Sequence, residues 1–178
     1  MKPLWRTGII LTTIAGAITS AILIFRGTNQ PSIAFTEEWI ATQVADGDSI
    51  TVGQTDGSQM EVELCGIDVP EMKQGKAPEQ TLANKAKQKL LKLVAAADNQ
   101  LMIIPVGKDL KGRTVAEVMA YGKGEADISF QEELLKDGLA KTRNSGLECP
   151  NHLAFEKAQE IAKASHIGVW SQSNLELP

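Results

Sequence analysis

Hydrophobic and polar residues alternate along several short runs in the middle of the chain, which is the pattern of half-buried β-strands. Two runs lie in "WIATQVADGDSITV", on either side of Asp46-Gly47-Asp48, and a third is "MEVELCGI". The Asp-Gly pair of "TDGS" between the second and third runs is typical of a hairpin turn. Two later runs are "QLMIIPVG" and "GRTVAEVMAYG". The sequence therefore predicts five strands, and the first three form a meander.

Three other segments have helical spacing. The first follows Pro78 and has one apolar stripe, formed by Leu82, Ala86, Leu90, Leu93 and Ala97. Its opposite face carries a row of lysines, which we interpret as a solvated helix face rather than a DNA-binding patch. A second helix is predicted over residues 128–136 and a third over residues 151–168. This order of elements predicts an α+β fold, a small antiparallel barrel with helices on one side, because a barrel closes the edges of a short sheet.

The N-terminus has the pattern of a targeting segment. Residues 8–25, "GIILTTIAGAITSAILIF", carry no charge and lie between Lys2 and Arg6 on one side and Arg26 on the other. This pattern favours a signal anchor, and a signal peptide cleaved after "TSA" is the alternative. The domain would be membrane-anchored outside the cytoplasm in the first case, and secreted or periplasmic in the second. We divide the chain into this segment (1–27), a linker (28–35), one domain (36–171) and a tail (172–178).

Composition and charge limit the function classes. The chain has 178 residues, of which 43% are hydrophobic and 22% charged, as in a globular protein. Outside residues 1–27 there are 15 basic and 22 acidic side chains, which argues against a broad nucleic-acid-binding face. A small site that meets a phosphate through a metal ion and one arginine stays compatible with this charge. Nothing in the sequence indicates more than a monomer.

The two cysteines, Cys65 and Cys149, allow two interpretations. An exported chain could pair them in a disulfide, but two isolated thiols are the interpretation that we favour. We do not expect these two cysteines to form a zinc site.

Two pairs of acids carry the candidate chemistry. Asp46 and Asp48 flank a glycine at one strand turn, and Asp68 and Glu71 flank Val69-Pro70 at another. Crowded carboxylates repel one another unless a cation lies among them, and oxygen ligands on turns suit Ca²⁺ or Mg²⁺. Taken singly, each pair is also typical of an ordinary turn. Arg113 is the candidate for binding a phosphate, since its planar fork can donate two parallel hydrogen bonds.

Five motifs together resemble the staphylococcal-nuclease (thermonuclease-like) family. They are "VADGDSITV", "GIDVPE", "GRTVAEV", "EELLKDGLAK" and "GVW", in the same order and with similar spacing over about residues 38–171. The resemblance implies a five-stranded OB-fold barrel with three helices, and a Ca²⁺-dependent phosphodiesterase that cuts DNA and RNA. It implies calcium ligands at the carboxylates of Asp48 and Asp68 and the backbone carbonyl of Val69, with Asp46 in support. It further implies that Glu71 is the general base and that Arg113 holds the phosphate.

The chain departs from the family at two places. Glu63 stands where the resemblance implies a second active-site arginine, five residues before Asp68, and a carboxylate there is expected to repel a phosphodiester. The family's pair of substrate-stacking tyrosines has no match after "GLAK", where the chain reads "TRNSGLECP". Either another cation supplies the missing charge, with Arg143, Lys73 and Lys111 as candidates, or the domain is a weak or inactive module that binds nucleic acid or protein.

Overall fold

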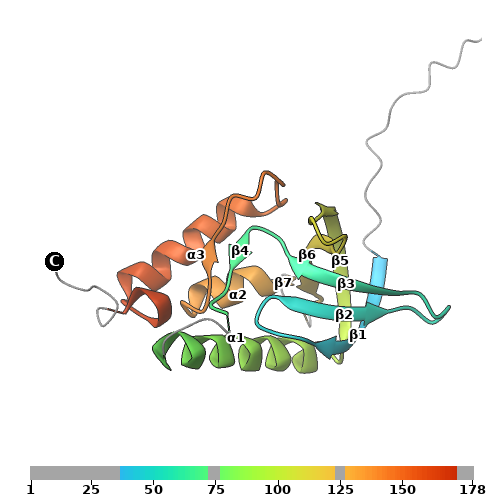
Figure 1. Ribbon diagram of the computed structural model, residues 1–178, viewed down its shortest axis with the longest axis horizontal. Helices are drawn as coiled ribbons and strands as arrows, with labels where there is room; N and C mark the ends of the chain where they lie inside the picture. The colour runs from blue at the N-terminus through green and yellow to red at the C-terminus, as the bar shows by residue number, and fades with distance from the viewer. Residues whose placement is uncertain (1–36, 72–76, 123–126, 172–178) are drawn as a thin grey trace, which may run out of the picture. The chain divides into compact units, whose positions relative to one another are not determined.

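The computed structural model describes residues 37–71, 77–122 and 127–171, which belong to one compact unit running from Ala34 to Pro178 (Figure 1). The predicted signal segment (1–27), the linker (28–35), the tail (172–178) and Lys73 lie outside these residues. Within the described ranges, the helices are all too short or too polar to span a bilayer.

Five strands form a closed barrel, as the alternating pattern predicts. They are β1 (Glu37–Val44), β2 (Ser49–Gly53), β3 (Gln59–Leu64), β5 (Gln100–Lys108) and β6 (Thr114–Ala120). The strands are hydrogen-bonded in the order β3-β2-β1-β5-β6, and a parallel pairing of β3 with β6 closes the ring. The closed barrel and its helices confirm the α+β, OB-fold-like prediction.

Three short strands were not predicted. β4 (Ile67–Asp68) pairs with β8 (Lys141–Thr142) in a separate two-stranded sheet. β7 (Ile128–Ser129) pairs with the end of β6, so the second helix, α2 (Phe130–Lys136), begins two residues later than predicted. The prediction was wrong there because backbone pairing with β6 holds these two residues extended.

The helices α1 (Ala77–Ala96) and α3 (His152–Ala164) flank the barrel together with α2 (Figure 1). Ala86 and Leu90 of the predicted α1 stripe are fully buried, which confirms the face of this helix that packs on the core. The predicted third helix was too long, because it ends at Ala164 and a separate 3₁₀ turn, η1 (Gly168–Trp170), follows. His166 has a φ of 51°, a left-handed conformation that interrupts the helix.

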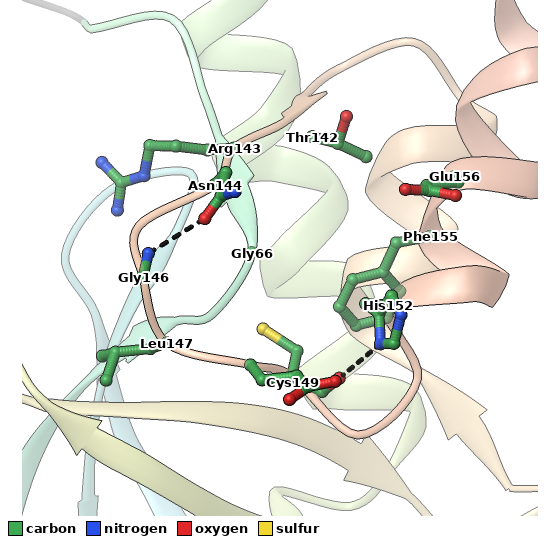
Figure 2. Close-up of a pocket in the computed structure, with 11 residues that line it drawn as sticks. Gly66, Thr142, Arg143, Asn144, Gly146, Leu147, Cys149, His152, Phe155 and Glu156 are labelled. Carbon is green, nitrogen blue, oxygen red and sulfur yellow. Dashed lines mark hydrogen bonds between the residues drawn. The ribbon is translucent and has the colours of Figure 1, made fainter.

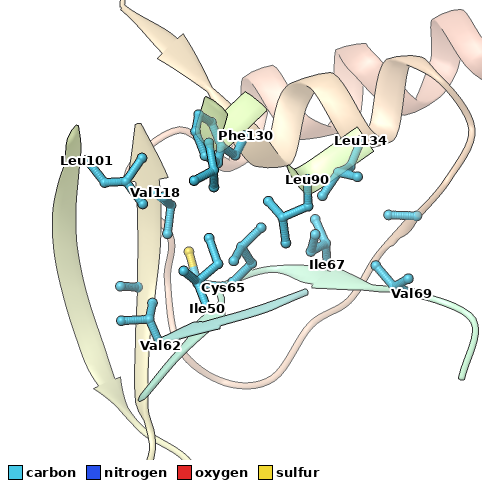
Figure 3. Packing of buried hydrophobic residues seen from close by; sticks show 14 of the residues in the cluster. Ile50, Val62, Cys65, Ile67, Val69, Leu90, Leu101, Val118, Phe130 and Leu134 are labelled. Carbon is cyan, nitrogen blue, oxygen red and sulfur yellow. The ribbon is translucent and has the colours of Figure 1, made fainter. Parts of the chain in front are cut away.

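The core lies between the barrel and the helices, and Figure 3 shows Ile50 and Val62 facing Leu90 and Phe130 across it. Cys65 and Cys149 are both buried and form a disulfide, so the prediction of two isolated thiols was wrong. The pairing depends on a close approach that 84 residues of sequence separation do not reveal. A Cβ on Gly66 would lie 2.7 Å from the Cys149 sulfur, so only glycine leaves room for this approach.

Candidate active site

The fold brings the two acidic turns together. Gly47 lies at the centre of the first turn, and a Cβ there would lie 2.6 Å from Val69 Cγ1 and 2.8 Å from Ala86 Cβ. A glycine therefore lets the turn between β1 and β2 pack directly against the residue that follows Asp68. The Lys87 ammonium of α1 donates to the Ala45 carbonyl at 2.8 Å and holds the same turn from the other side. The two turns that carry the predicted acids are therefore in contact, and the role of these acids as one site stays a prediction.

Asp46 and Asp48 differ strongly in their affinity for a proton. Burial raises the pKa of Asp48 to about 7, and the hydrogen bond and charge of Asp46 and the charge of Glu63 act in the same direction. The Asp46 carboxylate accepts hydrogen bonds from Ser49 Oγ at 2.6 Å and from the Asp48 N–H at 3.3 Å. Burial works against its charge, but these hydrogen bonds outweigh it and lower the pKa of Asp46.

The second turn presents its acids to solvent. The Asp68 side chain is 62% exposed, and its backbone pairs with Lys141 of β8. The Val69 side chain is buried against Gly47, and Glu71 is exposed after Pro70. One turn thus offers an exposed carboxylate, a backbone carbonyl and a second exposed carboxylate within four residues.

Arg113 is fixed by an acid that sequence reasoning did not single out. Asp109 accepts hydrogen bonds from the Lys111 and Arg113 N–H groups through Oδ1, at 2.9 and 2.8 Å, and from Arg113 Nε through Oδ2 at 2.8 Å. Partial burial disfavours the charge, but Asp109 and the charges of Glu63 and Asp48 raise the pKa of Arg113. The signal in the sequence was "DLKGR", since an aspartate commonly accepts from N–H groups of its own turn.

Glu63 lies between two arginines. Its Oε2 accepts from Arg113 Nη2, and its Oε1 accepts from Arg143 Nη2 at 2.7 Å. The side chain is only 10% exposed. Its charge is therefore paired on both oxygens, which differs from the unscreened repulsion that the sequence alone suggested.

Arg143 reaches this cluster because β8 pairs with β4. Thr142 lies opposite Ile67, and the Arg143 N–H donates to the Gly66 carbonyl at 2.8 Å. The guanidinium Nη1 lies 3.9 Å from Asp68 Oδ1. Its positive charge partly opposes the rise in the pKa of Asp48 that burial causes. Of the two candidate cations within the described residues, Arg143 and Lys111, these contacts place Arg143 beside the acids.

The oxygen donors of the two acidic turns are of the kind that a hard divalent cation binds. The carboxylates of Asp48, Glu63 and Asp68 lie near the two arginines, and burial, followed by the carboxylates of Asp46 and Glu63, raises the pKa of Asp48. Across the described part of the chain, three or more acidic, histidine or cysteine side chains do not gather in one metal-binding group. A cation held by Asp48, Asp68 and the Val69 carbonyl would therefore need water or phosphate oxygens to complete its shell.

The segment where the family's tyrosines have no counterpart lines a cavity of about 310 Å³, with Asn144, Leu147, His152 and Phe155 among its residues. Asn144 accepts from the Gly146 N–H at 3.0 Å, which shapes the loop. Arg143 also lines this cavity, and Figure 2 shows its guanidinium on the side away from His152 and Phe155.

Comparison with known proteins supports the family resemblance. The family model of staphylococcal nuclease homologues matches residues 61–172. The chain belongs to the staphylococcal nuclease family. It is similar to a thermonuclease of Staphylococcus intermedius, with 28% identity over 76% of this chain and 77% of that protein. A thermonuclease of Staphylococcus hyicus is 30% identical over 72% of this chain and 73% of that protein.

A third relative comes from outside the genus Staphylococcus. An uncharacterized endonuclease of Haemophilus influenzae is 31% identical over 74% of this chain and 65% of that protein. The staphylococcal nuclease family match begins inside β3 and ends just after η1, so it covers both Glu63 and Arg143.

Proposed function

We propose that the chain is a nuclease that hydrolyses phosphodiester bonds of DNA or RNA in a Ca²⁺-dependent reaction. The observation that supports this most directly is the packing of the Asp46–Asp48 turn against the Asp68–Glu71 turn, next to two arginines. The names of the relatives, two thermonucleases and an endonuclease, support the same function.

The metal would be held by the chain's own oxygens. Asp48 and Asp68 would bind it through their carboxylates and Val69 through its carbonyl, while Asp46 supports Asp48 through its hydrogen bonds. When bound, Ca²⁺ would polarise the phosphodiester and neutralise part of its charge.

Glu71 and Arg113 would act on the substrate. Glu71 is exposed at the rigid end of its turn, where it would accept the proton of the attacking water. Arg113 would bind the phosphate and stabilise the charge that develops at phosphorus, while Asp109 holds its Nε. Holding water and phosphate in line supplies much of the acceleration in such a site.

The test is cleavage of fluorescent single-stranded DNA and RNA by the purified chain, in millimolar Ca²⁺ and in chelator. Glu71→Gln should lower kcat by on the order of 10²–10⁴, as loss of a general base does. Arg113→Ala should lower kcat/KM by on the order of 10²–10³. Lys157→Gln removes an exposed positive charge on α3 and serves as the control that keeps full activity. If the folded protein cleaves neither substrate in Ca²⁺, the domain is a binding module instead.

A further inference from the structure

The pairing of Glu63 leaves one guanidinium group available to a ligand. One buried carboxylate balances half of the charge of two arginines, and Asp109 binds Arg113 a second time. Among the described residues, Arg143 has no such second hydrogen bond to a carboxylate, because its Nη1 is 3.9 Å from Asp68 Oδ1. An arginine carries five N–H donors, and within the part of the chain that the structure describes Glu63 is the carboxylate that accepts from the Arg143 guanidinium, so further donors can meet another acceptor.

The position of Arg143 suits a substrate contact. Its side chain is 41% exposed, against 26% for Arg113, so solvent and ligands reach it more easily. The Arg143 N–H donates to the carbonyl of Gly66, which precedes Asp68 by two residues, so the backbone of Arg143 is held beside this turn. Glu63 holds its guanidinium. Arg143 lines the cavity described above, and Figure 2 shows its guanidinium on the side away from His152 and Phe155.

We propose that Arg143 is the second phosphate-binding arginine of this site and that Glu63 is the positioning residue that holds Arg143 and Arg113 in place. The inference rests on the proposed function, since it assigns a role in the same phosphodiester site. The second phosphate-binding guanidinium then comes from the segment after α2, and not from β3. The position on β3 carries a carboxylate because that carboxylate binds the relocated arginine.

The competing explanation gives Glu63 the opposite effect. If Glu63 only repels the substrate, neutralising it raises activity. If Glu63 positions two arginines, neutralising it loosens both guanidinium groups and lowers activity. Glu63→Gln keeps the size of the side chain, so the sign of its effect on cleavage separates the two explanations.

The experiment measures kcat and KM for single-stranded DNA in Ca²⁺, and the affinity for the same DNA in the Glu71→Gln background, where cleavage does not interfere. Arg143→Ala should lower kcat/KM by on the order of 10²–10³ and weaken DNA binding about tenfold. Arg143→Lys keeps the charge but loses the planar fork, so it should recover only part of the activity. Lys157→Gln is the charge-matched control, with wild-type values expected.

The role of Glu63 has its own readout. Glu63→Gln should lower kcat about tenfold or more in the wild type. Its effect should be smaller in the Arg143→Ala background, where Arg113 is the one arginine of the pair left for Glu63 to position. A purely structural role would instead lower activity equally in both backgrounds. Thermal melting of each variant identifies any loss of folding, and Arg143→Lys provides the answer if Arg143→Ala does not fold.

The outcomes separate the inference from the proposed function. If the wild type cleaves DNA and Arg143→Ala and Arg143→Lys match it in kcat/KM and binding, the inference alone is overturned. An increase of activity in Glu63→Gln overturns the positioning role. If the folded wild type does not cleave but loses DNA affinity in Arg143→Ala, the nuclease function fails while phosphate binding by Arg143 stands. Absence of both cleavage and Arg143-dependent binding overturns the two together.

Discussion

The two carboxylates of the first turn, Asp46 and Asp48, have pKa values shifted in opposite directions although they are two residues apart. Asp46 accepts hydrogen bonds from Ser49 and from the Asp48 backbone, and its pKa is lowered. Asp48 is more deeply placed, and its pKa rises to about 7. Near neutral pH, Asp48 is thus divided between protonated and ionised forms, and a bound cation would compete with the proton.

This shift predicts a pH-dependent stability in chelator. The folded chain holds the Asp48 proton up to about pH 7, whereas the unfolded chain releases it near 3.8. Between these values the folded state binds more protons, so the Asp48 contribution to the free energy of unfolding falls as the pH rises. Asp48→Asn removes this contribution. We expect it to melt higher than the wild type at pH 8 by roughly 2–4 °C, or about 1 kcal/mol, with a smaller difference at pH 5. If the melting temperatures of the two proteins change in parallel between pH 5 and pH 8, the raised pKa of Asp48 is contradicted.

Short elements position the site more than the long ones do. The pairing of β4 with β8 involves only two residues from each strand, yet it places Arg143 beside Asp68 and Glu63. The start of α3 is fixed in a similar way by a buried acid on β6. Glu117 is fully buried and accepts from the Asn151 N–H at 3.2 Å, from Asn151 Nδ2 at 2.7 Å and from Ser129 Oγ at 3.3 Å.

Removing Glu117 should loosen α3 and the loop before it. Glu117→Ala leaves buried donors without their acceptor, which should lower the free energy of unfolding by roughly 2–3 kcal/mol. Glu61→Ala removes an exposed glutamate of β3 and should change stability by less than about 0.5 kcal/mol. Urea denaturation of both variants checks the difference. Equal stability of Glu117→Ala and the wild type would mean that water replaces the carboxylate.

The long elements could be predicted from the sequence and the short ones could not. Alternation in β1 to β3 and the stripe on α1 are local patterns, so they locate these elements without knowledge of the fold. β4, β7 and β8 contain two residues each and form only because distant segments meet them. The same limit explains why the sequence pointed to Glu63 but not to its partners, since the contact with Arg143 spans 80 residues of chain.

At the scale of the whole molecule, the disulfide connects the two halves of the site. Cys65 follows β3 two residues after Glu63, and Cys149 lies in the loop between Arg143 and α3. A bond across 84 residues restricts the unfolded chain more than the folded one. It also keeps the segment after β8 close to the end of β3, where Arg143 meets Glu63.

Loss of this bond should therefore destabilise the whole domain. Reduction with a phosphine, or the double substitution Cys65→Ala and Cys149→Ala, should lower the free energy of unfolding by roughly 3–5 kcal/mol on the chain-entropy model. Urea denaturation of the oxidised, reduced and double-alanine proteins measures this difference. The reductant should leave the double-alanine protein unchanged, which separates loss of the bond from other effects of the phosphine. If oxidised and reduced wild-type protein unfold at the same urea concentration, the bond restricts the unfolded chain no more than the native fold, and the stability comes from the barrel and its helices alone.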